Sequence, residues 1–163
     1  MNKDVVRVFG HPLHASMVHL PIGLLALAPA WDVVALASGG STWWAIGFWT
    51  VAAGVAVALL VALFGLAGLV RAVEEPAPRA TAIRHMLVNV GAVVAYAAGL
   101  LARGGALPPA GREVLVLVLD VAGLGLLSYA GWLGGELVFR HGVGSAGTSA
   151  EAPASARSRE RAA

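Results

Sequence analysis

Four long apolar runs constrain the fold of this chain more than any other feature of its sequence. They extend over about residues 15–38, 43–70, 81–102 and 114–139. Each run reaches the roughly 20 residues that an α-helix needs to cross about 30 Å of hydrocarbon. A single span in lipid must satisfy its own backbone groups, so each run is expected to be a helix. The sequence therefore predicts an all-α protein, a four-helix transmembrane bundle with up-down-up-down topology.

Short segments with helix-breaking residues separate the runs, at residues 39–41, 74–78 and 104–109. Residues 1–144 are therefore predicted to form one four-helix transmembrane domain. Residues 145–163 are mostly Ala, Ser, Gly, Glu and Arg, and are expected to be a disordered cytoplasmic tail. The triplet Ala28-Pro29-Ala30 is similar to a signal-peptidase site, but the apolar run continues beyond it, which favours a membrane span.

The composition argues against several classes of function. Only 12% of the residues are charged, whereas a soluble domain has about 25%. The basic residues lie between and beside the apolar runs and form no stripe with interleaved aromatic residues, which argues against nucleic-acid binding. The chain has no cysteine, which excludes disulfides, cysteine-ligated zinc and iron–sulfur clusters within it. No serine has an evident base partner, so a hydrolase site is not indicated.

The distribution of basic residues predicts the orientation in the membrane. Four spans place both termini on one side, and that side carries most of the basic residues close to the spans: Lys3, Arg7, Arg71, Arg79, Arg84 and Arg140. The opposite side carries Arg103 and Arg112. The positive-inside rule therefore places both termini in the cytoplasm, for a protein of the inner (plasma) membrane.

All five histidines are predicted to lie in the cytoplasmic half, although they come from three distant segments: His11, His14, His19, His85 and His141. With a rise of 1.5 Å per residue, His19 and His85 each lie about 11 Å from the midpoint of their spans. Imidazoles at equal depth on different helices can ligate a haem iron from opposite faces. We expect one b-type haem near the cytoplasmic face, with His19 and His85 as ligands and His14 and His141 as substitutes.

Three neighbouring polar residues fit this expectation. The guanidinium of Arg84 or Arg140 is suited to pairing with haem propionates. Asn89 lies one turn after His85 on the same helix face and could orient that imidazole. Glu136 precedes Arg140 by four positions, a spacing that predicts an ion pair on one helix face.

Two other interpretations of the histidines stay open. A divalent metal could be held by His11, His14 and His141, with His19 and His85 as further candidate ligands, because imidazole is the commonest metal ligand. In the simplest interpretation the histidines hydrogen-bond to water, lipid headgroups or helix ends, and the protein is a non-catalytic membrane subunit or scaffold. Whether the protein is an enzyme is left open. Lines of small residues on the third and fourth spans also allow a homo-oligomer.

Two acids, Asp32 and Asp120, lie deeper, each about 9 Å to the outer side of the midpoint of its span. If the two carboxyl groups faced each other at matching depth, they would share a proton and suit a proton relay. The alternative, which the sequence favours, is that each acid caps an outer helix end or reaches the membrane interface.

Several motifs support a family resemblance. They are His11-Pro12-x-His14, His19-x-Pro21-Ile22-Gly23, Arg84-His85-x-x-x-Asn89 and the segment 131–144. Over roughly residues 9–144 the chain resembles the bacterial domain-of-unknown-function 2231 family of four-helix membrane proteins. Asp32 falls where that family commonly has an acid, whereas Leu69-Val70-Arg71 stands where an acid often ends the second helix.

The resemblance carries its own implications for function. Some relatives are fused to Rieske-type iron–sulfur domains, and the layout is similar to that of small b-type cytochromes. The resemblance therefore implies redox work in the bacterial inner membrane, with a Rieske-type protein or a quinone as partner. These implications rest on fold and family alone, whereas function depends on the residues of a particular site.

Overall fold

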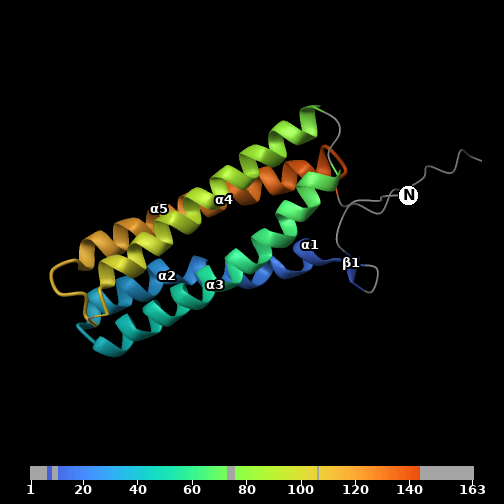
Figure 1. Cartoon of the computed structure of the whole chain (residues 1–163). Helices are drawn as coiled ribbons and strands as arrows, with labels where there is room; N and C mark the ends of the chain where they lie inside the picture. Colours follow the sequence, from blue (N-terminus) through green and yellow to red (C-terminus); the bar gives the residue numbers. More distant parts are fainter. Residues whose placement is uncertain (1–6, 9–10, 73–75, 106, 144–163) are drawn as a thin grey trace, which may run out of the picture.

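The computed structural model describes residues 7–8, 11–72, 76–105 and 107–143. Figure 1 shows long helices that run side by side and alternate in direction. The helices are α1 (Leu13–Met17), α2 (His19–Ser38), α3 (Ser41–Ala72), α4 (Pro76–Arg103) and α5 (Glu113–Phe139). The predicted all-α bundle is therefore confirmed, while the predicted tail at 145–163 lies outside the described residues.

A short strand pair precedes the bundle. β1 (Arg7–Val8) and β2 (His11–Pro12) pair antiparallel, with Val8 opposite His11. The end of the bundle that carries this pair and α1 is called the N-terminal end below. The opposite end, which carries the α2–α3 and α4–α5 connections, is called the loop end. Chain connectivity places the end of α5 at the N-terminal end as well (Figure 1).

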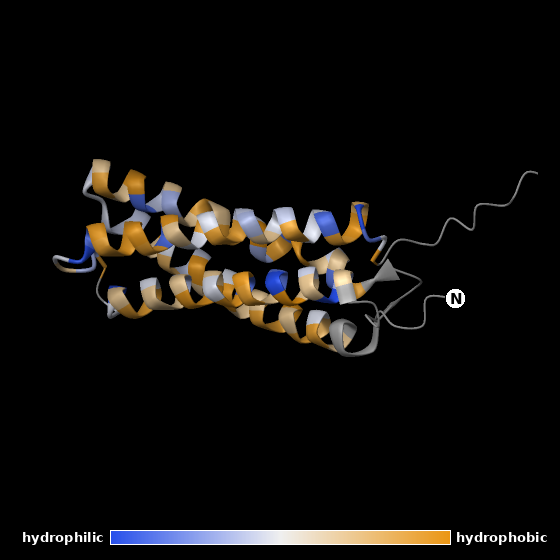
Figure 2. Ribbon diagram, turned by 90° about the horizontal axis from the view of Figure 1, so that it is seen from above, coloured by the Kyte–Doolittle hydropathy of each residue, from blue (hydrophilic) through white to orange (hydrophobic). Residues whose placement is uncertain are grey.

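Each of the four long segments is sufficiently apolar and extended to cross a membrane. The first candidate span joins α1 to α2 over Leu13–Ser38, and the others are Ser41–Ala67, Ala77–Arg103 and Glu113–Phe139. Figure 2 shows apolar residues along the whole length of the bundle. Large apolar side chains such as Trp132 and Phe139 are exposed on its surface, where lipid can cover them. The protein is therefore a multi-pass membrane protein.

The helices pack as two hairpins, α1–α2–α3 and α4–α5, with the most extensive contacts inside each hairpin. Two buried clusters join the hairpins. One contains Leu25, Ala28, Val51 and Tyr96, and the other contains Ala35, Trp44 and Val116. The first cluster lies near the middle of the bundle. The second lies at the loop end, where α2 ends and α3 begins. The N-terminal half of the bundle has no such shared cluster among the described residues.

Equivalent positions of the two hairpins make equivalent contacts. Leu25 of α2 and Tyr96 of α4 are 71 residues apart and touch across the bundle. A Cβ atom added to Gly54 of α3 would lie 2.6 Å from Leu25, and one added to Gly123 of α5 would lie 2.7 Å from Tyr96. In each hairpin, therefore, a glycine of the second helix admits a large side chain of the first. This pattern indicates an internal repeat of one helical hairpin, with the first helices of both copies parallel.

A proline in α2 explains the hydrogen bond that joins the two hairpins. Pro29 lies inside α2 and has no backbone N–H, so the carbonyl of Leu25, four residues earlier, lacks its helical donor. The hydroxyl of Tyr96 donates to this carbonyl at 2.8 Å. In a membrane interior every backbone carbonyl needs such a partner, because water is absent.

Replacing Tyr96 by phenylalanine is therefore expected to lower the free energy of unfolding by about 1–3 kcal/mol, because it leaves a buried carbonyl without a donor. Denaturation in mixed detergent micelles, followed by circular dichroism, measures the change. Tyr129, the other tyrosine of the chain, is 53% exposed and provides the matched control. If Tyr96→Phe and Tyr129→Phe unfold at the same denaturant concentration, the hydrogen bond to Leu25 contributes nothing to stability.

Candidate functional site

Three charged side chains from three helices meet inside the bundle near the loop end. Arg103, the last residue of α4, donates from Nη1 to Asp32 Oδ1 at 2.9 Å and from Nη2 to Asp32 Oδ2 at 3.1 Å. Its Nη2 also donates to Asp120 Oδ2 of α5 at 2.8 Å. All three side chains are fully buried. The guanidinium therefore binds Asp32 in the two-pronged geometry typical of strong arginine–carboxylate pairs and bridges it to Asp120.

Small residues on the neighbouring helices make room for this charged cluster of Asp32, Arg103 and Asp120. A Cβ atom on Gly99 would lie 2.7 Å from Asp120 Oδ1, and one on Gly47 would lie 3.1 Å from Asp32 Oδ1. The ring of Trp44 lies 5.9 Å from the guanidinium carbon of Arg103, within the range of a cation–π contact. The cluster thus sits in a close-fitting cradle, which larger residues at 47 or 99 would disrupt.

This arrangement corrects one sequence-based interpretation. The alternative that the sequence favoured, in which each acid caps a helix end or reaches the membrane interface, is wrong. Asp32 and Asp120 lie close together, and both are fully buried and bound to Arg103. The reason is Arg103, which the sequence pattern indicated only as a loop charge on the outer side. One signal could have identified it: Arg103 follows Asp32 by 71 residues, the same separation as Leu25 and Tyr96. It is therefore the counterpart of Asp32 in the repeat.

At the N-terminal half, one imidazole of each hairpin is anchored to a backbone carbonyl. His14 Nδ1 lies 3.1 Å from the carbonyl oxygen of Val61 in α3. A Cβ atom on Gly65, one turn further along α3, would lie 2.9 Å from the His14 ring. A side chain on a helix covers the turn that precedes it, so a glycine at position 65 leaves the Val61 carbonyl open to the imidazole.

His85 makes the same contacts in the second hairpin. Its Nδ1 lies 2.9 Å from the carbonyl oxygen of Ala130 in α5, and a Cβ atom on Gly134 would lie 3.2 Å from its ring. The carbonyl can only accept, so the proton of a neutral His85 resides on Nδ1 and Nε2 presents a lone pair. The amide nitrogen of Asn89 lies 3.2 Å from this Nε2 and donates to the His85 carbonyl at 2.8 Å. The predicted orienting contact of Asn89 is therefore present.

His14 and His85 occupy equivalent positions of the repeat, in α1 of the first hairpin and in α4 of the second. Each is held through Nδ1, so each can present Nε2 as a metal-binding nitrogen. The structure thus holds His14 and His85 in equivalent ways in the N-terminal half of the bundle, while His19 projects from α2 with an exposed side chain. Equal depth along the spans had suggested His19 as the partner of His85, but depth does not specify the direction in which a helical side chain points.

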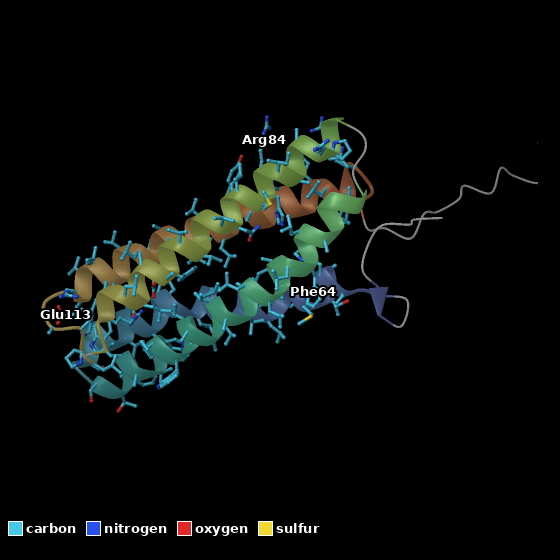
Figure 3. All side chains as sticks on the ribbon, in the orientation of Figure 1. Phe64, Arg84 and Glu113 are labelled. Atoms are coloured by element: carbon cyan, nitrogen blue, oxygen red, sulfur yellow. The ribbon has the colours of Figure 1, made fainter. Side chains whose placement is uncertain are left out.

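The remaining predicted residues lie at the periphery. Arg84 is exposed on α4, and Figure 3 shows it at the edge of the bundle. Arg140 is exposed and pairs with Glu136 at 2.8 Å, as the spacing predicted. His141 follows α5 and is half-buried. His11 belongs to β2, and its side chain lies outside the described part.

The described residues contain no group of three or more His, Cys, Asp or Glu side chains arranged to hold a metal ion. A structural zinc site takes four protein ligands and a catalytic one takes three. The imidazole pair of His14 and His85 supplies two. Two imidazoles therefore suit a metal ion whose other coordination positions are occupied by non-protein ligands.

Comparisons with known proteins agree with the membrane fold. The model of a family described as "Predicted membrane protein (DUF2231)" matches residues 10–147. This range includes the imidazole pair, the charged cluster and the helices α1 to α5. Searches of curated proteins and of solved structures found no significant match to the chain.

Proposed function

This chain belongs to the DUF2231 family of predicted membrane proteins, and we propose that it binds one b-type haem between His14 and His85 and transfers electrons. The single observation that carries the proposal is the imidazole pair itself. Two histidines from equivalent helices are each anchored through Nδ1 to a carbonyl of a neighbouring helix. A hydrogen bond at Nδ1 orients the ring, sets the tautomer and makes Nε2 a better ligand.

The residues around the pair fit a flat macrocycle. Haem iron already has four nitrogen ligands from the porphyrin, so two imidazoles complete its coordination without a third protein ligand. Gly65 and Gly134 have no side chain, so the two imidazole rings can lie directly against the backbones of α3 and α5. The N-terminal half of the bundle also lacks a buried apolar cluster shared by both hairpins among its described residues. Binding would require His85 Nε2 to exchange its contact with Asn89 for the metal.

Each protein group has a role in this proposal. His14 and His85 hold the iron, and the carbonyls of Val61 and Ala130 orient the two rings. Arg84, one residue before His85, offers a guanidinium to a propionate at the membrane boundary. A bound haem would supply reversible one-electron transfer. The electron partner that the family resemblance suggests is a Rieske-type iron–sulfur protein or a quinone.

The proposed setting is the bacterial inner membrane, with both termini in the cytoplasm. The asymmetry of arginine and lysine between the two sides supports this orientation. The haem would then lie toward the cytoplasmic leaflet, and the charged cluster toward the outer leaflet.

The experiment is a reduced-minus-oxidised absorption spectrum of the protein purified in mild detergent from haem-supplied cells. We expect a Soret band and a sharp α band in the wild type, with at least tenfold less haem per protein in His14→Ala and His85→Ala. His19→Ala is the matched control, because His19 is an exposed histidine of the same span. Its spectrum should equal that of the wild type.

Two outcomes would contradict the proposal. One is a folded, monodisperse wild-type protein without either absorption band. The other is loss of haem in His19→Ala while His14→Ala retains it. Elemental analysis of the same samples tests the alternative of a bare divalent metal, and a stable partner without any cofactor would favour a scaffold.

A further inference from the structure

The charged cluster near the loop end contains more acidic groups than basic groups. Asp32 and Asp120 bring two carboxyl groups, and Arg103 brings one guanidinium, with no exposure of any of the three side chains. Fully ionised, the cluster would carry one net negative charge in a fully buried position. An uncompensated charge in such surroundings is costly, and proteins avoid it by pairing or neutralising the group.

No other charged group compensates this negative charge within the described residues. The face of α3 contributes Trp44 and Gly47, which carry no charge. Tyr96 of α4 directs its hydroxyl to a backbone carbonyl. Beyond the loop end, Arg112 is exposed and donates to the Ala102 carbonyl, while half-buried Glu113 accepts from the Gly111 backbone N–H.

The hydrogen bonds show where the imbalance lies. Asp32 accepts at both of its carboxyl oxygens, but Asp120 accepts only at Oδ2, and its Oδ1 is buried without any partner. The Nε of Arg103 is buried without a partner as well. The two carboxyl groups meet at the same nitrogen, because Arg103 Nη2 donates to Asp32 Oδ2 at 3.1 Å and to Asp120 Oδ2 at 2.8 Å. Asp120 is thus bound like a neutral acid, whereas Asp32 is bound like a carboxylate.

We infer that Asp32, Arg103 and Asp120 form a proton-binding site that holds one proton on the two carboxyl groups, mainly on Asp120. The proton makes the cluster electrically neutral and removes the charge from the carboxyl oxygen that has no donor. Arg103 ends α4, and the exposed Gly104-Gly105 turn follows it directly, so the loop end is the side from which the proton exchanges. This inference does not depend on haem binding.

Infrared spectroscopy of the full-length protein in lipid vesicles tests the inference. We expect the carbonyl band of a protonated carboxylic acid at neutral pH, shifted in D₂O and shifted again when aspartate carboxyl carbons are isotope-labelled. Asp120→Asn, which keeps the shape of a protonated acid, should lose the band. Glu113→Gln removes a half-buried carboxyl group outside the cluster at the same end and should keep the band.

The result that overturns the inference is a wild-type spectrum without a protonated carboxyl band at neutral pH, since both aspartates would then be ionised. A band that persists in Asp120→Asn and is insensitive to aspartate labelling overturns it as well. Labelling needs no substitution, so the test remains decisive even if an asparagine variant fails to fold. The only other aspartate of the chain is Asp4, near the polar amino terminus.

Discussion

Replacing Arg103 by methionine is expected to lower the free energy of unfolding by about 3–5 kcal/mol, because it removes one partner of a buried ion cluster. Arg103 donates all three hydrogen bonds that hold Asp32 and Asp120 together. Methionine is similar in length but has no donor and no charge, so two buried carboxyl groups lose their counter-ion. Denaturant titration in mixed micelles, with circular dichroism as the signal, measures the loss.

Arg112→Met is the matched control for this substitution. Arg112 is exposed, and its side chain donates to the Ala102 carbonyl at 3.3 Å. Surface substitutions of this kind usually change stability by no more than about 0.5 kcal/mol. Equal stability of the two methionine variants would show that the buried ion pairs contribute nothing.

A triple variant separates the loss of packing from the loss of charge compensation. When Asp32→Asn and Asp120→Asn are added to Arg103→Met, no buried charge remains. Much of the lost stability should then return, because replacing a whole buried ion cluster by neutral groups is often close to neutral, whereas removing one member is not. If the triple variant is no more stable than Arg103→Met, packing rather than charge explains the effect of Arg103.

Replacing Gly123 by alanine is expected to destabilise the bundle by about 1–3 kcal/mol through overpacking. The new Cβ atom would lie 2.7–2.9 Å from three carbons of the Tyr96 ring. That ring cannot easily move away, because its hydroxyl is bonded to the Leu25 carbonyl and its side chain is fully buried. The same denaturation assay measures the change.

Gly125, two positions along α5, offers a matched control. A Cβ atom there meets nothing within 4 Å, so Gly125→Ala should lose no stability and can gain up to about 1 kcal/mol from helix propensity. If Gly123→Ala and Gly125→Ala are equally stable, the close approach of α5 to Tyr96 does not matter for stability.

Some of the side-chain contacts followed from spacing along one helix. The ion pair of Glu136 with Arg140 and the contact of Asn89 with His85 each join residues four positions apart. A regular helix places such residues on one face, so no tertiary information is needed. That Asp32 and Asp120 could lie at the same level of the bundle was also predictable, because the rise per residue is constant along both helices.

Which histidines are anchored to a neighbouring helix was not predictable in this way. Depth is one coordinate, and the direction of a side chain around the helix axis is another. Almost every position of these spans is apolar, so no polar face marks which side of a helix lies against its neighbours. His19 and His14 therefore looked alike in the sequence, although one is exposed and the other contacts α3.

By itself the amino-acid sequence determined that this protein crosses a membrane four times as helices, because lipid leaves an apolar run of this length no other way to satisfy its backbone. Only the tertiary structure decided that Arg103 turns inward to join two aspartates and that His14, rather than His19, is anchored to α3. Those outcomes depend on how the helices pack against each other, and contacts between residues 71 positions apart leave no local trace in the chain.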